Sequence, residues 1–224
     1  MAARVRMTRC VSRMFCVAAV NLAIAGCADI SDTDMGKVGA LVFHEITNIG
    51  TSESVPRARA AAIPYASLGV RLGSSDESMF VLGNKTGNDL HWLGGQRLAI
   101  TTRAGRIVQT AGFEHNLTGF QGSATVPSPG TTSRTEDFMY DFAGRSRFGI
   151  AVRCSVRPIG GERLVILGVP HDTNHVAEDC EAPQLDWRFR NEFWSDGSGL
   201  VWKSKQSVEP DLDAFELEIL RPAE

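Results

Sequence analysis

The chain has 224 residues, of which 43% are hydrophobic and 22% charged, with 22 glycines and 9 prolines. This composition lies in the globular range and excludes a disordered, collagen-like or coiled-coil chain. The formal net charge is −3; without the four arginines of the first 26 residues, 19 basic and 26 acidic side chains remain, a net charge of −7. Such an acidic chain repels phosphate backbones, so we expect no nucleic acid among its partners.

Residues 1–26 have the pattern of a secretory signal peptide. Arg4, Arg6, Arg9 and Arg13 precede an almost wholly apolar run at residues 14–26. A bilayer span needs about 20 apolar residues, so this run is too short to cross a membrane. Its length suits the hydrophobic region of a signal peptide, which is removed after export.

The apolar run ends in Ile24-Ala25-Gly26-Cys27, which resembles the bacterial lipobox. We expect the Cys27 thiol to carry a diacylglycerol and to become the new N-terminus, since two or more acyl chains give stable anchoring. In bacterial lipoproteins an aspartate directly after this cysteine causes retention in the inner membrane, and here that position is Ala28. The prediction is a lipid-anchored outer-membrane protein whose domain faces the periplasm. The alternative is an ordinary signal peptide with a cysteine there by chance.

Two cysteines, Cys154 and Cys180, remain in the mature domain, because Cys10 and Cys16 leave with the signal. The periplasm is oxidising, so an even pair favours one disulfide. Two separately buried thiols are the alternative. No CxxC motif is present, and we expect neither a metal site nor a cofactor.

The mature chain divides into a tether and one β domain. Residues 27–64 are predicted to be a lipid-anchored tether with a short helix at 35–46, where apolar residues recur near helical spacing. Residues 65–224 are predicted to be an all-β domain of about 11–12 mostly antiparallel strands, forming a sandwich or a partly open barrel. The expected strands are 70–72, 79–82, 90–93, 98–102, 106–110, 134–142, 148–157, 163–169, 176–180, 187–195, 200–207 and 214–220.

The motifs that mark common enzymes are missing from the sequence. It contains no GxSxG, GxxxxGK[ST], GxGxxG or HExxH motif. His171, Asp172, His175, Asp179 and Cys180 have metal-ligand types, but residues four apart on extended chain lie about 13 Å from one another, too far for one ion. We therefore expect these to be solvated loop residues, and the protein is predicted not to be an enzyme.

The segment 187–195 contains the candidate ligand-binding residues. Alternation places Trp187, Phe189 and Phe193 on a core face, and Arg188, Arg190 and Trp194 on the opposite face. An indole ring beside arginines can stack on a sugar ring and hydrogen-bond its hydroxyls or carboxylates. Coverage of Trp194 by a loop or by the N-terminal segment is the competing interpretation.

Three stretches together resemble a known family. They are Ile63-Pro64-Tyr65-Ala66-Ser67, Gly105-Arg106-Ile107-Val108-Gln109-Thr110-Ala111-Gly112, and Asn191-Glu192-Phe193-Trp194-Ser195-Asp196 followed by Gly199 and the stretch 204–207. In this order after a lipobox, the chain is similar to the YjbF/GfcB lipoproteins of exopolysaccharide and group 4 capsule loci. The resemblance implies a mostly antiparallel β fold and a role in building or exporting surface polysaccharide. It also implies an outer-membrane β-barrel secretion protein as a neighbour, and it supplies no catalytic residues.

Three functional hypotheses follow. The leading one is a non-enzymatic outer-membrane lipoprotein of exopolysaccharide or capsule assembly and export that binds glycan or a secretion partner. The second is a lipocalin-like periplasmic carrier or chaperone for an acylated ligand. The third is a periplasmic hydrolase. A polar groove favours the first, an apolar cavity the second, and a carboxylate pair across a cleft the third.

Overall fold

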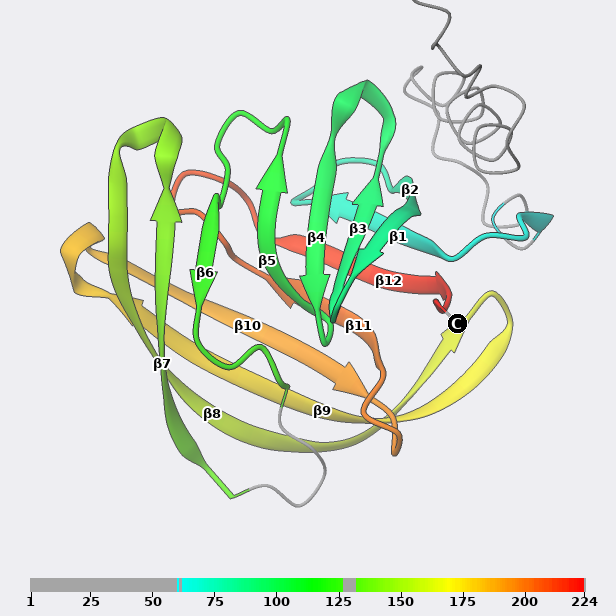
Figure 1. Ribbon diagram of the computed structural model, residues 1–224. Helices are drawn as coiled ribbons and strands as arrows, with labels where there is room; N and C mark the ends of the chain where they lie inside the picture. The colour runs from blue at the N-terminus through cyan, green and yellow to red at the C-terminus, as the bar shows by residue number, and fades with distance from the viewer. Residues whose placement is uncertain (1–59, 61, 127–131, 224) are drawn as a thin grey trace, which may run out of the picture.

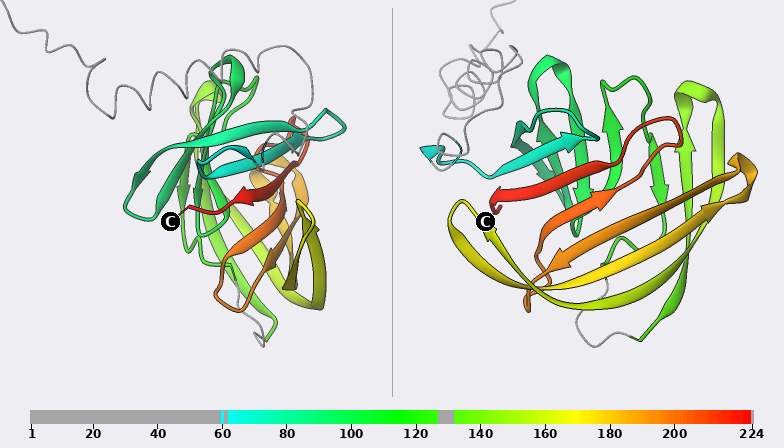
Figure 2. Two further views of the ribbon diagram at one scale, coloured as in Figure 1. Left: turned by 90° about the vertical axis from the view of Figure 1, so that its right-hand side faces the viewer. Right: turned by 180° about the vertical axis from the view of Figure 1, so that it is seen from behind.

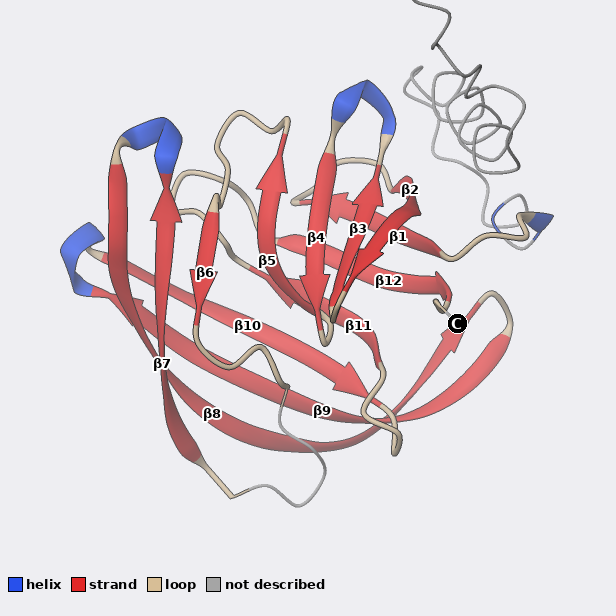
Figure 3. Ribbon diagram, viewed as in Figure 1, coloured by secondary structure: helices blue, strands red, loops and turns tan. Residues whose placement is uncertain are grey.

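Twelve antiparallel β-strands form one continuous sheet in the computed structural model, which describes residues 60, 62–126 and 132–223. Three short 3-10 helices lie in turns between strands (Figure 3): η2 (Gly95–Arg97), η3 (Ala143–Arg145) and η4 (Pro183–Leu185). The strands are β1 (Ser67–Leu72), β2 (Ser78–Thr86), β3 (Asp89–Leu93), β4 (Ala99–Arg103), β5 (Arg106–Ala111), β6 (Gly119–Gln121), β7 (Arg134–Phe142), β8 (Arg147–Ile166), β9 (Val169–Ala182), β10 (Trp187–Ser195), β11 (Val201–Gln206) and β12 (Phe215–Arg221).

The sheet curls into a nearly closed barrel (Figures 1 and 2). Its strand order is β5-β4-β3-β2-β1-β12-β11-β10-β9-β8-β7-β6, so the first and last strands pair in the middle, and β5 and β6 are the two edges. The gap between β5 and β6 is the seam of the barrel, and the connection between these two strands hydrogen-bonds to β5. Thr110 donates its N–H to the Leu117 carbonyl at 2.8 Å, and Leu117 donates its N–H to Thr110 Oγ1 at 3.0 Å. The all-β antiparallel prediction is confirmed, in its barrel form.

Aromatic side chains fill the inside of the barrel. Trp92 is fully buried, and its indole N–H donates to Thr102 Oγ1 at 2.9 Å. Phe113 packs edge-to-face on Phe215 with ring centroids 5.0 Å apart. Because buried aromatic rings interlock at high density, this packing favours a solid core over a carrier cavity for an acyl chain. The largest fully buried side chains include Trp92, Tyr140, Phe80, Phe142, Phe193 and Phe215.

A buried ion pair crosses this core. The guanidinium of Arg106 on β5 donates two hydrogen bonds to the Glu178 carboxylate on β9, at 2.9 and 2.5 Å, and both side chains are at most 1% exposed. Arg106 also lies between the rings of Phe138 and Phe193, 4.8 and 4.9 Å from their centroids. Burial alone would lower the pKa of Arg106, but the Glu178 carboxylate raises it, so the guanidinium stays charged.

Two amides extend this polar network to neighbouring strands. Asn191 donates to Glu178 Oε2 at 3.4 Å and accepts the Ser207 N–H at 2.9 Å. Gln206 accepts the Ile107 N–H at 2.8 Å and donates to the Gly105 carbonyl at 2.9 Å. Hydrogen bonds in the interior therefore connect the edge strand β5 to β9 and β11, in addition to its ladder with β4.

The structure joins Cys154 on β8 to Cys180 on β9 by a disulfide. The two residues stand directly opposite each other in the β8–β9 ladder, with their Cα atoms 4.0 Å apart. Both cysteines are buried in the core. The predicted pairing is thus present as a cross-strand link between two central strands.

Several sequence-based boundaries are corrected by the structure. The segment 163–169 is wrong as a separate strand, because β8 runs without a break to Ile166 and the turn at Leu167 and Gly168 lies inside that segment. The glycines after Pro158 allow a β-bulge instead of a turn, since the register shifts there and the ladder continues. Strand β6 was not expected. The predicted helix at 35–46, the signal peptide and most of the tether lie outside the described residues. Within the described ranges, no helix is long and apolar enough to cross a bilayer.

Candidate functional site

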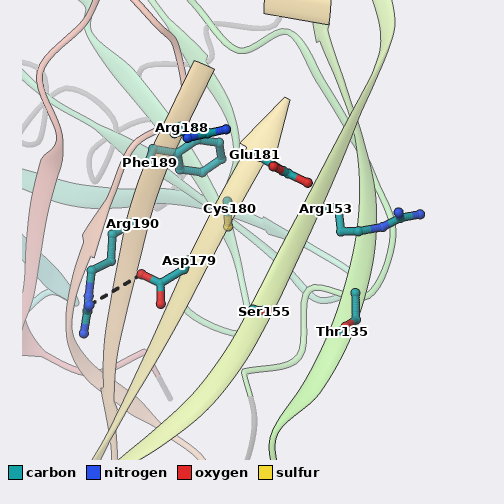
Figure 4. A pocket seen from close by; sticks show the side chains of 9 residues that line it. All are labelled: Thr135, Arg153, Ser155, Asp179, Cys180, Glu181, Arg188, Phe189 and Arg190. Atoms are coloured by element: carbon teal, nitrogen blue, oxygen red, sulfur yellow. Dashed lines mark hydrogen bonds and ion pairs between the residues drawn. The ribbon is translucent and has the colours of Figure 1, made fainter. Parts of the chain in front are cut away.

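Two neighbouring hollows on the outer face of β7 to β10 form the candidate site. They have volumes of about 640 and 730 Å³, and both are lined by Arg153 and Glu181. We call their combined surface the flank groove, and Figure 4 shows the first of the two hollows. The first hollow is lined by Thr135, Arg153, Ser155, Asp179, Cys180, Glu181, Arg188, Phe189 and Arg190. The second adds residues from β6, β7, β8 and η4, and among them Met139 is an apolar side chain that is 43% exposed.

Strand register assembles the polar side chains of the flank groove into rows. One row crosses four strands as Asp137, Arg153, Glu181 and Arg188, each directly opposite the next. Because alternate residues of a strand face opposite sides, the neighbours of these residues point into the core. The next row is Thr135, Ser155, Asp179 and Arg190.

Most charges in the flank groove have partners. Arg153 Nε donates to Asp137 Oδ1 at 2.8 Å, and this hydrogen bond raises the pKa of Arg153 above its usual value. Arg190 lies 3.4 Å from Asp179 Oδ1, and Arg157 pairs with the other oxygen of that carboxylate. Arg188 has no hydrogen bond or ion pair within the part of the chain that the structure describes. It is an exposed guanidinium with five free donors.

The structure brings Arg188 and Arg190 together with β8 and β9 residues in the groove, but it places Trp194 elsewhere. The Trp194 ring is only 8% exposed. Its indole N–H donates to Glu162 Oε2 at 2.7 Å, and its face stacks on His175 with centroids 4.2 Å apart. Lys203 lies over the ring at 5.5 Å. A direct sugar contact by Trp194 would require the long β8–β9 hairpin to move.

The histidine-containing segment is also placed differently from the expectation. His171 and His175 are in strand β9, not in a solvated loop, because the second half of β8 pairs with this segment as far as Val169. His171 packs on Trp202 of β11 with ring centroids 3.7 Å apart. His175 lies 3.6 Å from Glu162 and 3.4 Å from Glu192. These histidines hold the hairpin against β10 and β11.

Metal-ligand residue types meet at one place in the described ranges, namely Cys154, Glu178 and Cys180. The two sulfurs are bonded to each other, and both Glu178 oxygens accept hydrogen bonds from Arg106. Neither group is available to coordinate an ion in this state.

Sequence reasoning missed the acidic and β8 members of the groove. The available signal was the alternation of Arg153 and Ser155 with Val152 and Cys154, which marks the outward face of a strand. The register that places Glu181 beside Arg153 joins two residues that are 28 positions apart, and no local pattern reveals it.

An all-β domain that follows a lipobox-like segment has the organisation of a bacterial lipoprotein. The family model described as "Group 4 capsule polysaccharide lipoprotein gfcB, YjbF" matches residues 36–220, so the chain belongs to this family. It is 25% identical over 212 residues to the protein named "Uncharacterized lipoprotein GfcB" of Escherichia coli (strain K12), covering 90% of this chain and 95% of the relative. The crystal structure of the hypothetical lipoprotein YmcC from Escherichia coli (K12) has the same fold, with a TM-score of 0.64 and 20% identity over 86% of this chain and 97% of that one.

Proposed function

We propose that this chain is a non-enzymatic outer-membrane lipoprotein of exopolysaccharide or capsule assembly and export, and that it binds glycan along the flank groove. The observation that carries the proposal is Arg188, which has no ion-pair partner among the described residues and ends a row of alternating charges across four strands. Membership in a capsule polysaccharide lipoprotein family supports the ligand class.

The groove chemistry suits an extended polar chain. Arginine forks donate to hydroxyl and carboxylate oxygens, and the acidic groups between them accept from hydroxyls. Met139 and the aliphatic stems of the arginines offer apolar surface to the C–H faces of sugars. Because the groove is open and shallow, it fits a polymer that passes over the sheet better than a small enclosed ligand.

The test is the double substitution Arg188→Ala with Arg190→Ala. The two side chains lie on the outer face, so the fold and its unfolding temperature are expected to change little. The affinity for the capsule or exopolysaccharide of the producing strain, measured by calorimetry or surface plasmon resonance, is expected to fall about tenfold or more.

Arg163→Ala is the matched control. Arg163 is an exposed arginine of β8 whose ion-pair partner is Asp172 on the same hairpin, outside the groove. Equal loss of affinity in the control would indicate a general charge effect. Wild-type binding by the folded double variant would refute the groove. In that case a secretion partner, tested by co-purification with the outer-membrane β-barrel protein, becomes the leading ligand.

Anchoring is the other half of the proposal, and it depends on Cys27. The Cys27→Ala variant is expected to lack acyl chains and to be found either soluble or uncleaved, because the thiol is the acceptor of the lipid. Metabolic labelling with palmitate followed by separation of the two membranes checks both the lipid and its location. Undiminished labelling of the variant, or wild-type protein in the inner membrane, would contradict the proposed anchoring.

A further inference from the structure

The β8–β9 hairpin extends past the end of β10 and finishes in an apolar turn, drawn in yellow in Figure 1. We call the segment 164–170 the hairpin tip. Its sequence is Leu-Val-Ile-Leu-Gly-Val-Pro, without a polar side chain. Val165 is 64% exposed, Val169 is 54% exposed, and Pro170 is exposed beside them. These side chains therefore face solvent at the end of a protruding element.

Apolar side chains occupy both faces of the hairpin tip. Val165 stands opposite Pro170 in the ladder, and Ile166 stands opposite Val169. Because neighbouring residues of a strand face opposite sides, these two pairs lie on different faces. A strand pair that only covers its own core is apolar on one face and polar on the other. The hairpin tip therefore has more apolar surface than packing against this barrel requires.

The turn of the hairpin tip contains a leucine at a position that favours glycine or asparagine. Leu167 has a φ of 49° and Gly168 a φ of 80°, so both central residues of this two-residue turn are left-handed. Left-handed backbone is sterically unfavourable for a bulky side chain such as leucine. The turn thus keeps an apolar side chain at its end against the local backbone preference, which indicates an apolar environment outside the fold.

The hairpin tip lies on the same side of the barrel as the start of the described chain. In Figures 1 and 2 the yellow turn is close to the cyan segment that leads into β1. Cys27, the proposed site of the lipid, precedes this segment in the chain. A lipid anchor acts on the domain through this entry point, so the side that carries the hairpin tip is the side tethered to the bilayer.

The composition and size of the hairpin tip fit a lipid surface better than a protein partner. A stable protein interface buries about 800 Å² on each side and combines apolar with polar groups. Seven residues without a polar side chain offer neither that area nor side chains for hydrogen bonds. In a bilayer surface, by contrast, apolar side chains need no hydrogen-bonding partner, and the paired strands satisfy much of the backbone.

Charged residues mark how far the hairpin can enter a bilayer. Arg163 and Asp172 form an ion pair of 2.7 Å, and both side chains are more than half exposed. Arg163 is four residues from Leu167, which corresponds to about 13 Å along a strand. Interfacial segments bury their apolar face by about 5–10 Å. Insertion of the hairpin tip to this depth leaves the ion pair among the lipid headgroups.

We propose that the hairpin tip inserts into the surface of the bilayer that holds the acyl anchor. This proposal rests on the lipid anchoring proposed for Cys27 and adds a second point of membrane contact to it. Acyl chains on a tether keep the domain at the membrane but leave it free to rotate. With the hairpin tip inserted, the barrel and its flank groove have one fixed orientation relative to the membrane.

Spin labelling of the full-length mature lipoprotein tests the insertion. Val169→Cys is labelled with a nitroxide and reconstituted in vesicles of phosphatidylethanolamine and phosphatidylglycerol. The introduced thiol reacts alone once Cys27 carries its lipid, because Cys154 and Cys180 are bonded to each other. Oxygen concentrates in hydrocarbon, and a nickel chelate stays in water. The ratio of oxygen to nickel accessibility is expected to be about fivefold or more above that of a label in water.

Phe148→Cys is the matched control. Phe148 is 64% exposed, as Val165 is, and it lies at the opposite end of β8. Its label is expected to stay accessible to the nickel chelate in the same vesicles. Addition of Val165→Asp to the Val169→Cys protein introduces a charge into the hairpin tip and is expected to lower the ratio to that of the control label.

Three outcomes would overturn the insertion. These are a tip label as accessible to nickel as the control label, a tip label shielded from both probes, which indicates a protein surface, and spin–spin broadening, which indicates a second copy of the chain. Mass spectrometry of Cys27 separates the anchor from the hairpin tip. Acylated protein with its tip label in water refutes only the insertion, and protein without acyl chains whose tip label enters the bilayer refutes only the anchor.

Discussion

The guanidinium of Arg106 on edge strand β5 donates two hydrogen bonds to the carboxylate of Glu178 on β9. Both side chains lie inside the barrel and are buried from solvent. The two residues are 72 positions apart in the chain. Strand β5 has a ladder partner on one side only, so this pair and the Gln206 amide hold its other side. The interior ion pair therefore attaches this edge strand to the opposite part of the barrel.

Removal of one partner of this pair is expected to destabilise the fold strongly. Arg106→Met leaves Glu178 as a buried charge without its partner, and such changes cost about 3–5 kcal/mol. Glu178→Leu is expected to act similarly, because it leaves the buried Arg106 guanidinium without its partner. The double variant Arg106→Met with Glu178→Leu removes both charges and is expected to recover part of the loss. Urea unfolding of the oxidised protein measures all three, and additive single losses in the double variant would contradict the coupling.

The disulfide between Cys154 and Cys180 closes a loop with a sequence separation of 26. Its loss in Cys154→Ser with Cys180→Ser is expected to reduce the free energy of unfolding by about 3–4 kcal/mol, because the unfolded chain gains freedom. Reduction of the wild type under mild denaturant provides the same comparison without substitution. Both cysteines reacting with iodoacetamide in unreduced protein from the periplasm would contradict the bond.

Substitution of Trp194 distinguishes a role of this residue in stabilising the fold from a role in binding a ligand. Trp194→Ala removes the stacking on His175 and the hydrogen bond to Glu162, and we expect a loss of about 3 kcal/mol. Trp194→Phe keeps a ring and loses the N–H, so its cost is expected to be smaller. Thermal unfolding measures both variants. A Trp194→Ala protein with wild-type stability and weaker glycan binding would instead assign the ring to the ligand.

The lowered pKa of Asp196 predicts that the free energy of unfolding depends on pH. Burial would raise its pKa, but hydrogen bonds from Ser198, from the Trp202 indole at 2.8 Å and from the Leu200 N–H hold it below the ordinary 3.8. A carboxyl group whose pKa is lowered by folding stabilises the protein above its unfolded pKa, and this contribution is lost as the pH falls through the folded pKa.

The comparison of wild type with Asp196→Asn tests this dependence. The wild type is expected to be more stable by about 1 kcal/mol near neutral pH. The difference is expected to shrink steadily once the pH falls below 3.8, the ordinary value for aspartate. Unfolding curves at a series of pH values measure it, and a constant difference down to strongly acidic pH would contradict the assignment.

Local pattern was enough to predict most strands and the face on which many side chains lie. The alternation from Ile150 to Val156 correctly separated core from surface, and Arg188 and Arg190 were correctly placed opposite the aromatic core. Turn signals misled at Pro158 and Gly160, because a bulge absorbs these residues while β8 continues. A local pattern shows which face a residue occupies but not which residue lies across from it.

The groove and the buried pair depend on long-range register. The sequence around Arg106 does not reveal that this arginine is buried or that its partner is Glu178. A surface arginine in the same strand would have the same hydrophobic neighbours. The burial of Trp194 likewise depends on Glu162, which comes from a hairpin that extends beyond the end of β10. The residues of these two contacts are 72 and 32 positions apart in the chain, too far for a local pattern to pair them.

Strands β1 and β12 pair with each other, with Ser67 opposite Arg221, while the two sheet edges β5 and β6 are consecutive in the chain. A break of the chain in the β5–β6 connection therefore interrupts none of the pairings between strands. A circular permutant that starts in the β5–β6 connection and joins the C-terminus to the residues before β1 by a short linker retains every strand pairing. Such a protein would begin at the seam of the barrel instead of ahead of β1, so an anchor fused to its N-terminus would hold the same fold in a different orientation.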